Sequence, residues 1–326
     1  MRILLYEPAY QSFEADLTGL GADLEFIRMQ SDGALRLDGE AIEPADARAE
    51  IAWANSQLYL DGPVRDFMIH CLKTEHLRWF QSSAAGFEHP VFLSLQEKGV
   101  RLTNTDAGAV AIAEFVMARV METFHPVAER HAAQSAADWA RLEFREISRT
   151  NWLVIGMGNI GSEIARRAQA FGADVVGVRR TPRGDEPAGR VVTPDALPSV
   201  LGDADVIVLA AATNAQSTGL VDQAFLARLK PDTVLVNIGR GALVDEAALL
   251  ESLDDGRPGR AILDVFETEP LPPESPFWRH PRVWVTAHSA AYTAGTRRRG
   301  GEIFIDNLGR YLTGQPLRFQ VTDVRD

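Results

Sequence analysis

The sequence predicts an α/β protein with two doubly wound, parallel-sheet domains. Short β-branched runs alternate with longer helix-like stretches along the chain, which is typical of parallel sheets with crossover helices. The 326 residues are enough for two medium domains, each with a core of its own. The strand-like runs fall into two series, and a stretch rich in Ala, Val and Met at 107–123 separates them. That stretch predicts a long buried helix.

We expect five strands in the first series and six in the second. Those of the first series are Ile3–Tyr6, Leu24–Ile27, Ile51–Ala54, Leu77–Gln81 and Arg101–Asn104. Those of the second series are Trp152–Gly156, Val175–Val178, Val206–Ala210, Val234–Ile238, Ala261–Val265 and Val283–Thr286. The tail from Tyr292 to Asp326 has the pattern of a helix followed by an extended end. We therefore expect the tail to return and complete the first domain.

The overall composition excludes several classes of function. A formal net charge of −12 argues against a general nucleic-acid surface, because phosphates would be repelled. The single cysteine, Cys71, allows no intramolecular disulfide and fits a reducing compartment. We expect no signal peptide, no membrane span and no membrane partner, and hence a cytoplasmic protein. The seven histidines lack the spacing of metal ligands, so we expect no metal.

The most specific motif is the run Leu-Val-Ile-Gly-Met-Gly-Asn-Ile-Gly at 153–161, which a helix-like stretch follows. An apolar strand, a G-x-G-x-x-G turn and a helix start form the context of a Rossmann-type dinucleotide site. We expect Gly156 to allow the tight turn, Gly158 to let the cofactor phosphates approach, and Gly161 to let the helix pack against the strand. Asn159 and Ile160 would add backbone N–H groups at the positive end of the helix dipole.

The end of the next strand predicts which dinucleotide is preferred. A site for NAD usually has Asp or Glu there, about 20 residues past the glycines, to accept the ribose 2′-OH. This sequence has Arg179, Arg180 and Thr181 instead. Guanidinium groups can hold a 2′-phosphate through charge-assisted hydrogen bonds. We therefore expect NADP(H) to be preferred, with NAD(H) possible; the alternative is that the arginines only form a solvated loop.

Three strands of the second series are followed by polar residues that could perform chemistry: Arg240, Glu269 and His288. The carboxyl ends of parallel strands lie at one edge of a sheet, where ligands bind. An arginine can hold a carboxylate, a histidine can give or take a proton, and a glutamate can orient the imidazole. Hydride transfer between a nicotinamide and a 2-keto acid needs all three functions: the carboxylate must be held, a proton transferred and the imidazole oriented. Each residue also has a structural alternative: a capping or core histidine, a solvated acid, or an ion-pair partner.

These segments together resemble the D-isomer-specific 2-hydroxyacid dehydrogenase family over nearly the whole chain. The motifs are the glycine turn at 154–161, Val-Asn-Ile-Gly-Arg-Gly-Ala-Leu-Val-Asp at 236–245, Leu-Asp-Val-Phe-Glu-Thr-Glu-Pro-Leu at 263–271 and Thr-Ala-His-Ser-Ala at 286–290. The resemblance implies a flavodoxin-like substrate domain, residues 1–103 and 292–326. It also implies that an NAD(P)-binding Rossmann domain, residues 104–291, is inserted into it, and that the protein is a homodimer.

The resemblance also implies roles for individual residues. The catalytic trio would be Arg240, Glu269 and His288. His288 would act as acid/base with Glu269 as its partner, and Arg240 would bind the substrate carboxylate. Asp264 and the carbonyl of Ile238 would flank the nicotinamide. Backbone N–H groups of Ala85 and Gly86 would receive the substrate carboxylate.

Two departures from the family pattern affect these roles. Ala287 stands where the family usually has a proline before the histidine, which relaxes the backbone there. The stretch 210–214 lacks the usual proline after its strand, which puts cofactor contacts there in doubt.

These expectations combine into an NADP(H)-preferring reductase of small 2-keto acids, with glyoxylate or hydroxypyruvate as the leading substrate. Two alternatives remain open: a dinucleotide-sensing corepressor that needs little turnover, and a phosphite dehydrogenase on the same scaffold. The run Arg297-Arg298-Arg299 could attract a larger anionic substrate or could be a solvated helix face.

Overall fold

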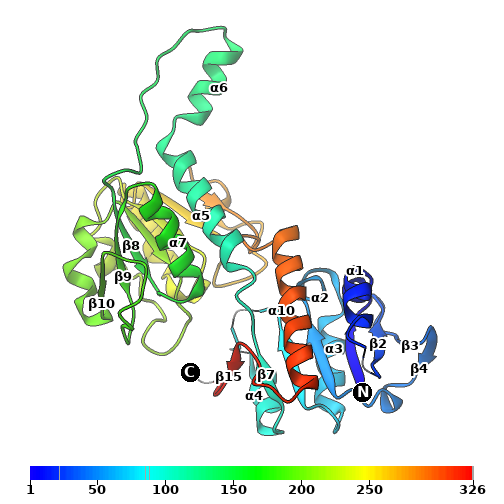
Figure 1. Ribbon diagram of the computed structural model, residues 1–326. Helices are drawn as coiled ribbons and strands as arrows, with labels where there is room; N and C mark the ends of the chain where they lie inside the picture. The colour runs from blue at the N-terminus through cyan, green and yellow to red at the C-terminus, as the bar shows by residue number, and fades with distance from the viewer. Residues whose placement is uncertain (22, 85, 88, 325–326) are drawn as a thin grey trace. The chain divides into compact units, whose positions relative to one another are not determined.

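The computed structural model describes residues 1–21, 23–84, 86–87 and 89–324 (Figure 1). The chain forms two compact units, residues 1–107 with 293–326, and residues 108–292. The expected domain junctions, 103/104 and 291/292, lie close to these boundaries. None of the helices in the described part of the chain has the length and apolar character needed to cross a membrane.

The first unit contains a mixed sheet in which the described residues form eight strands in the order β15-β7-β6-β5-β1-β2-β3-β4. The strands from β7 to β2 are parallel, and β15, β3 and β4 are antiparallel to their neighbours. The elements are β1 (Arg2–Tyr6), α1 (Glu7–Thr18), β2 (Glu25–Met29), β3 (Leu35–Leu37), β4 (Glu40–Ile42), η1 (Pro44–Asp46), β5 (Ile51–Ala54), α2 (Ser56–Asp61), α3 (Val64–Lys73), β6 (Trp79–Ser82), α4 (Pro90–Glu97), β7 (Arg101–Thr103), α10 (Ala294–Leu312) and β15 (Gln320–Val321).

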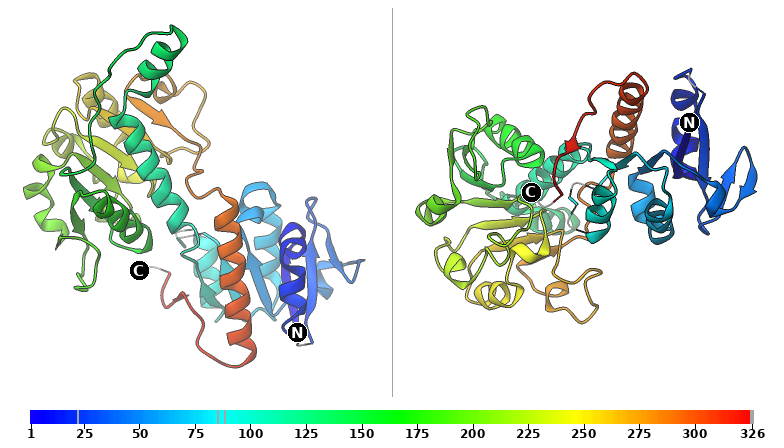
Figure 2. Two further views of the ribbon diagram at one scale, coloured as in Figure 1. Left: turned by 45° about the horizontal axis from the view of Figure 1, so that its top comes forward. Right: turned by 90° about the horizontal axis from the view of Figure 1, so that it is seen from below.

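Helices cover both faces of this sheet. On one face α1 and α10 pack together (Figure 2). Phe304 of α10 stacks on Trp53 with ring centroids 4.3 Å apart. On the other face, side chains from α2, α3 and α4 pack against the same strands. The C-terminal helix is therefore part of the core of the first unit, and the tail returns to this unit as expected.

A buried polar network fixes the tail to the sheet. The side chain of Asn307 donates to Gln81 Oε1 (3.0 Å) and accepts from the backbone N–H of Arg318 (2.7 Å). Thr103 also donates to Gln81 Oε1 (3.2 Å), and Trp79 Nε1 donates to Thr103 (2.8 Å). Because the network satisfies these buried amides and hydroxyls, it stabilises one register between α10, β6 and β7.

The second unit contains a sheet in which all pairings between the described strands are parallel, in the order β10-β9-β8-β11-β12-β13-β14. The elements are α5 (Ala109–Phe124), α6 (Val127–Ser135), β8 (Asn151–Ile155), α7 (Asn159–Ala170), β9 (Asp174–Val178), β10 (Arg190–Val192), η2 (Pro194–Ser199), η3 (Leu201–Asp203), β11 (Val206–Leu209), α8 (Gln223–Leu226), β12 (Val234–Asn237), η4 (Gly241–Leu243), α9 (Glu246–Asp254), β13 (Arg260–Leu263), η5 (Pro276–Trp278) and β14 (Val283–Val285).

The central strands of this sheet are buried on both faces, which explains their nearly continuous apolar sequences. β11 (Val-Ile-Val-Leu) and β12 (Val-Leu-Val-Asn) expose no residue. One face packs against α5 and α7, and the other against α8, α9 and the short helices. The strand order reverses between β8 and β11, which is the doubly wound switch point. The α/β class and the doubly wound arrangement are confirmed.

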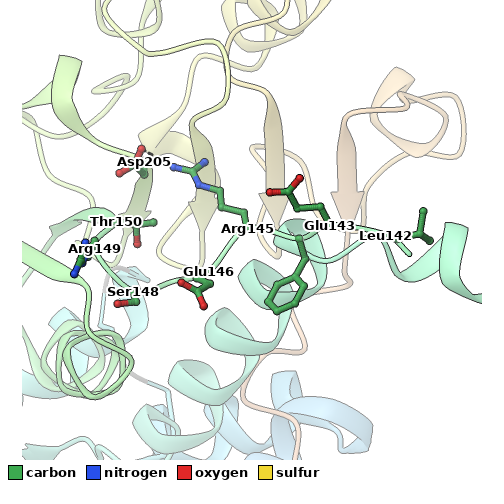
Figure 3. Close-up of a pocket in the computed structure, with 9 residues that line it drawn as sticks. Leu142, Glu143, Arg145, Glu146, Ser148, Arg149, Thr150 and Asp205 are labelled. Atoms are coloured by element: carbon green, nitrogen blue, oxygen red, sulfur yellow. Dashed lines mark hydrogen bonds and ion pairs between the residues drawn. The ribbon is translucent and has the colours of Figure 1, made fainter. Parts of the chain in front are cut away.

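A projecting arm leaves the second unit after α5. It consists of α6 and the extended segment up to Asn151, and α6 stands away from the sheet of its unit (Figures 1 and 2). A surface hollow at the base of the arm is lined by residues 142–146, 148–150 and Asp205 (Figure 3). Thr150 and Asp205 precede β8 and β11, so this hollow lies at the amino edge of the sheet, opposite the edge that carries the glycine turn.

Asp205 ties the arm to the sheet. Its carboxylate accepts from Arg145 (2.6 Å), Lys230 (2.6 Å) and the backbone N–H of Asn151 (2.7 Å). Burial raises the pKa of Asp205, but these donors outweigh burial and hold the pKa below the ordinary value for aspartate. The ionised carboxylate therefore anchors both Arg145 and the start of β8.

The expected number of strands was too low in both sheets. The sequence predicted five and six, whereas the described residues form eight and seven. The strands that were missed are β3, β4, β10 and β15, each of only two or three residues. Such short segments carry too few residues for a hydrophobic period, and their pairing partners decide their conformation. The expected helix at 107–123 is α5.

Candidate active site

The glycine turn follows β8, and its three glycines have different structural roles. Gly156 has a φ of +103°, and a Cβ there would lie 2.6 Å from the backbone of Ala210. A Cβ on Gly161 would lie 2.0 Å from the carbonyl oxygen of Gly156. A Cβ on Gly158 would meet no described atom within 4 Å. Gly156 and Gly161 are therefore needed by the fold, whereas Gly158 leaves open backbone at the start of α7, as a pyrophosphate requires.

Arg179 follows β9 and lies against this turn. Its Nη1 atom donates to the carbonyl oxygen of Met157 (2.7 Å) and lies 3.7 Å from Glu186 Oε1. The side chain of Arg179 is 21% exposed, so it is not a freely solvated loop residue. Arg180 and Thr181 are exposed in the loop that follows. The guanidinium of Arg179 is thus held at the position where a dinucleotide site for NAD usually has the acidic residue that accepts the ribose 2′-OH.

His288 and Glu269 are in direct contact. Nδ1 of His288 lies 2.8 Å from Oε2 of Glu269, and Oε1 of Glu269 accepts from the backbone N–H of Phe266 (2.9 Å). One carboxylate oxygen is therefore fixed by the backbone and the other by the imidazole. The side chain of His288 is 55% exposed, so the ring is open to a ligand. With Nδ1 occupied by Glu269, Nε2 is the ring atom available for proton transfer.

Asp264 organises the turn that carries His288. This aspartate is buried, with 2% of its surface exposed. Its carboxylate accepts from the hydroxyl of Thr286 (2.6 Å) and the N–H groups of Ser289 (2.9 Å) and Ala290 (3.0 Å). The N–H of His288 donates to the backbone carbonyl of Asp264 (2.8 Å). These bonds hold His288 in the left-handed region, at a φ of +48°. The turn is therefore held by these hydrogen bonds, although residue 287 is alanine and not proline.

Arg240 stands in a tight turn after β12. The side chain of Asn237 donates to the carbonyl of Arg240 (2.9 Å) and accepts from the N–H of Gly239 (3.1 Å). A Cβ on Gly241 would lie 1.9 Å from the carbonyl carbon of Phe266, so only glycine allows this turn to approach the segment after β13. The backbone next to Arg240 thus packs directly on the segment that leads to Glu269.

The three candidate residues follow three neighbouring strands. β12 pairs with β13, and β13 pairs with β14, all in parallel. Arg240, Glu269 and His288 therefore lie at the carboxyl edge of the sheet, the same edge as the glycine turn. A cation, an imidazole and its acidic partner at this edge can bind an anionic substrate and transfer a proton.

The remaining expected residues lie in three different segments. Ile238 is buried directly after β12, and its N–H donates to the carbonyl of Leu209 (3.2 Å). Gly86 is half-buried in the loop after β6, whereas Ala85 lies outside the described residues. In α10, Arg298 lies 3.6 Å from Glu302, and Arg299 donates to the carbonyl of Ala107 (2.9 Å). These two arginines therefore have structural partners within the first unit.

Sequence reasoning missed the residues that shape these turns. Asn237 and Thr286 orient the segments around Arg240 and His288, and Met157 supplies the carbonyl that Arg179 contacts. A polar residue at the end of an apolar strand was the only signal for Asn237. The contacts of Thr286 and Met157 depend on segments distant in the sequence.

Comparisons with known proteins identify the family of the chain. Residues 117–290 match the family model described as "D-isomer specific 2-hydroxyacid dehydrogenase, NAD binding domain". The chain belongs to the D-isomer-specific 2-hydroxyacid dehydrogenase family. It is therefore an enzyme of an NAD(P)-dependent dehydrogenase family, and the insertion of the NAD-binding domain into the substrate domain is as expected from the resemblance.

Two curated relatives show how far the similarity extends. Glyoxylate/hydroxypyruvate reductase A of Salmonella typhi is 33% identical over 243 residues, which cover 73% of this chain and 75% of that protein. D-3-phosphoglycerate dehydrogenase of Methanocaldococcus jannaschii is 28% identical over 247 residues, or 74% of this chain. The match spans 47% of the length of that second relative.

Solved structures of the family match nearly the whole chain. A D-isomer-specific 2-hydroxyacid dehydrogenase family protein from Aeromonas salmonicida subsp. salmonicida has a TM-score of 0.79 at 27% identity, covering 99% of this chain and 98% of that one. An NADPH-dependent glyoxylate/hydroxypyruvate reductase from Sinorhizobium meliloti, solved with NADP and sulfate, has a TM-score of 0.73 at 27% identity and covers 98% of both chains.

The different roles of the glycines predict different effects of adding one methyl group. Gly161→Ala should lower the free energy of unfolding of the protein by at least about 3 kcal/mol, because the Cβ has backbone atoms in its place. Gly158→Ala should change that free energy by no more than about 1 kcal/mol but weaken dinucleotide binding, because the methyl group projects where the phosphates approach. Denaturant unfolding and cofactor titration measure the two effects. Equal stability of the two variants would contradict this assignment.

Proposed function

We propose that the protein is an NADP(H)-preferring reductase that converts small 2-keto acids, with glyoxylate or hydroxypyruvate as the leading substrate, into D-2-hydroxy acids. The observation that carries this proposal is the 2.8 Å contact between His288 Nδ1 and Glu269 Oε2. The imidazole of His288 is at the same time exposed enough to contact a ligand. The relatives named as glyoxylate/hydroxypyruvate reductases support the substrate class. The bound nicotinamide would supply or accept the hydride.

In the proposed mechanism, each of the three residues has one task. Arg240 binds the substrate carboxylate through its guanidinium fork and aligns the neighbouring carbonyl. His288 donates a proton from Nε2 to the oxygen of that carbonyl as negative charge develops there. Glu269 accepts a hydrogen bond from Nδ1, which orients the ring and leaves Nε2 facing the substrate. In the reverse direction, Nε2 accepts the proton of the hydroxy acid.

The preference for NADP(H) rests on Arg179. A carboxylate at this position would repel a 2′-phosphate, whereas the guanidinium can bind it. Because Met157 fixes the side chain beside the glycine turn, the cation is preorganised for a phosphate on the ribose. The solved relative from Sinorhizobium meliloti, which contains NADP, supports this preference.

We also propose that the protein is a homodimer formed through the projecting arm of the nucleotide-binding unit. α6 buries none of its residues within the described chain, and Trp139, which follows it, is 92% exposed. Phe144 and Phe171 are also half-exposed near the base of the arm. An exposed apolar surface of this kind indicates a protein interface. A second copy of the chain is the partner that the family resemblance supports.

His288→Ala should lower kcat by roughly 10²–10⁴-fold while the dissociation constant for NADPH changes little, because the imidazole acts in proton transfer. Steady-state assays with glyoxylate and hydroxypyruvate, together with NADPH titration, test this. His76→Ala removes an exposed histidine of the first unit and should retain full activity. Unchanged turnover of His288→Ala would remove histidine from the mechanism, and NADPH binding without turnover in the wild type would instead indicate a sensor.

Arg179→Asp should reverse the cofactor preference, with kcat/KM for NADPH falling by about 10–100-fold, because a charge-assisted hydrogen bond of about 1.5–3 kcal/mol is lost. Assays of wild type and variant with NADPH and NADH measure the change. Arg228→Asp, an equal charge reversal at an exposed position of the same unit, serves as the control. If Arg179→Asp still preferred NADPH to the same degree, the assignment would fail.

The proposed dimer should have about twice the 35.8 kDa mass of the chain in solution. Light scattering at micromolar concentration measures this mass. Trp139→Ser should shift the distribution toward the monomer, because the exposed indole would lie in the interface. A wild-type mass equal to that of one chain would contradict the proposal.

A further inference from the structure

The loop after Arg179 contains a carboxylate that is turned inward. Residues 181–185 are exposed, yet the side chain of Glu186 is only 3% exposed. An acidic side chain in a solvent-facing loop normally extends into water. The inward position of this carboxylate therefore requires compensating contacts.

These contacts are two hydrogen bonds from the backbone and one ion pair. Glu186 Oε1 accepts from the N–H of Arg183 (2.8 Å), and Oε2 accepts from the N–H of Gly184 (2.9 Å). Oε1 also lies 3.7 Å from Nη1 of Arg179. The N–H of Arg183 is the largest of the influences that lower the pKa of Glu186, so the side chain stays ionised near neutral pH.

The contacts of Glu186 fix a turn within the loop. The turn at 183–184 is closed onto the carboxylate, and Gly184 supplies the positive φ of +87° that the turn adopts. The same carboxylate lies 3.7 Å from Nη1 of Arg179, the atom that donates to the carbonyl of Met157. Arg179 thus contacts both a carbonyl of the glycine turn and a carboxylate of its own loop.

We propose that Glu186 is a specificity-determining positioning residue, which holds the 183–184 turn and the guanidinium of Arg179 in the arrangement that accepts a ribose 2′-phosphate. This inference rests on the proposed preference for NADP(H). Glu186 acts through Arg179 and does not itself contact the phosphate.

A competing effect has the opposite sign. A carboxylate near a 2′-phosphate repels it, so repulsion alone would make the removal of Glu186 strengthen phosphate binding. The geometry favours positioning, because two backbone N–H groups and one guanidinium already compensate the carboxylate charge. The two effects can therefore be separated by the direction of the change in affinity.

The test compares the binding of 2′,5′-ADP and 5′-AMP, which differ only in the 2′-phosphate, to the full-length protein by calorimetry. Glu186→Ala should bind 2′,5′-ADP about tenfold more weakly than the wild type, the equivalent of about 1.4 kcal/mol. Its affinity for 5′-AMP should stay within about twofold, and a general collapse of the site would lower both affinities alike. Glu186→Gln, which keeps one acceptor oxygen, should be intermediate.

Asp185→Asn is the matched control, because it removes an equal charge from the exposed neighbouring residue. It should leave both affinities within about twofold of the wild type. If Glu186→Ala bound 2′,5′-ADP as tightly as the wild type, or more tightly, the positioning role would be overturned. If the wild type itself did not distinguish the two nucleotides, the preference for NADP(H) would fail, and this inference with it.

Discussion

The geometry of the candidate active site depends on the buried carboxylate of Asp264. A left-handed conformation such as that of His288 costs an ordinary residue roughly 1–2 kcal/mol. The side chain of Asp264 accepts three hydrogen bonds from residues 286–290. Because these bonds tie both sides of His288 to one buried residue, they hold the turn in this conformation. The imidazole can then reach Glu269 without an additional loss of conformational entropy.

Glycine has a comparable role on the neighbouring strands, where it allows backbones to approach. Gly241 brings the turn of Arg240 against the backbone of Phe266, and Phe266 in turn binds one oxygen of Glu269. The three residues proposed for catalysis are thus connected through main-chain contacts and not through long side chains alone. Such preorganisation reduces the reorganisation needed when charge develops on a substrate.

The sequence predicted the parts of the protein that depend on local pattern. The long apolar strands, the glycine turn at 156–161 and the polar residues after β12, β13 and β14 were readable because period, turn chemistry and strand ends are local properties. The short strands, the arm and the inward carboxylate of Glu186 were not readable. Their conformations depend on partners elsewhere in the chain, such as Asp205 for the arm, and pattern alone cannot identify those partners.

The stacking of Trp53 on Phe304 joins residues that lie on opposite sides of the inserted unit in the sequence. During synthesis, the strand that carries Trp53 leaves the ribosome long before α10 does. Throughout that interval, the face of the sheet that α10 covers has no native partner, whereas residues 108–292 already contain all of their own sheet. The insertion therefore imposes an order of assembly: the nascent substrate unit cannot bury this aromatic surface until translation has passed the nucleotide-binding unit.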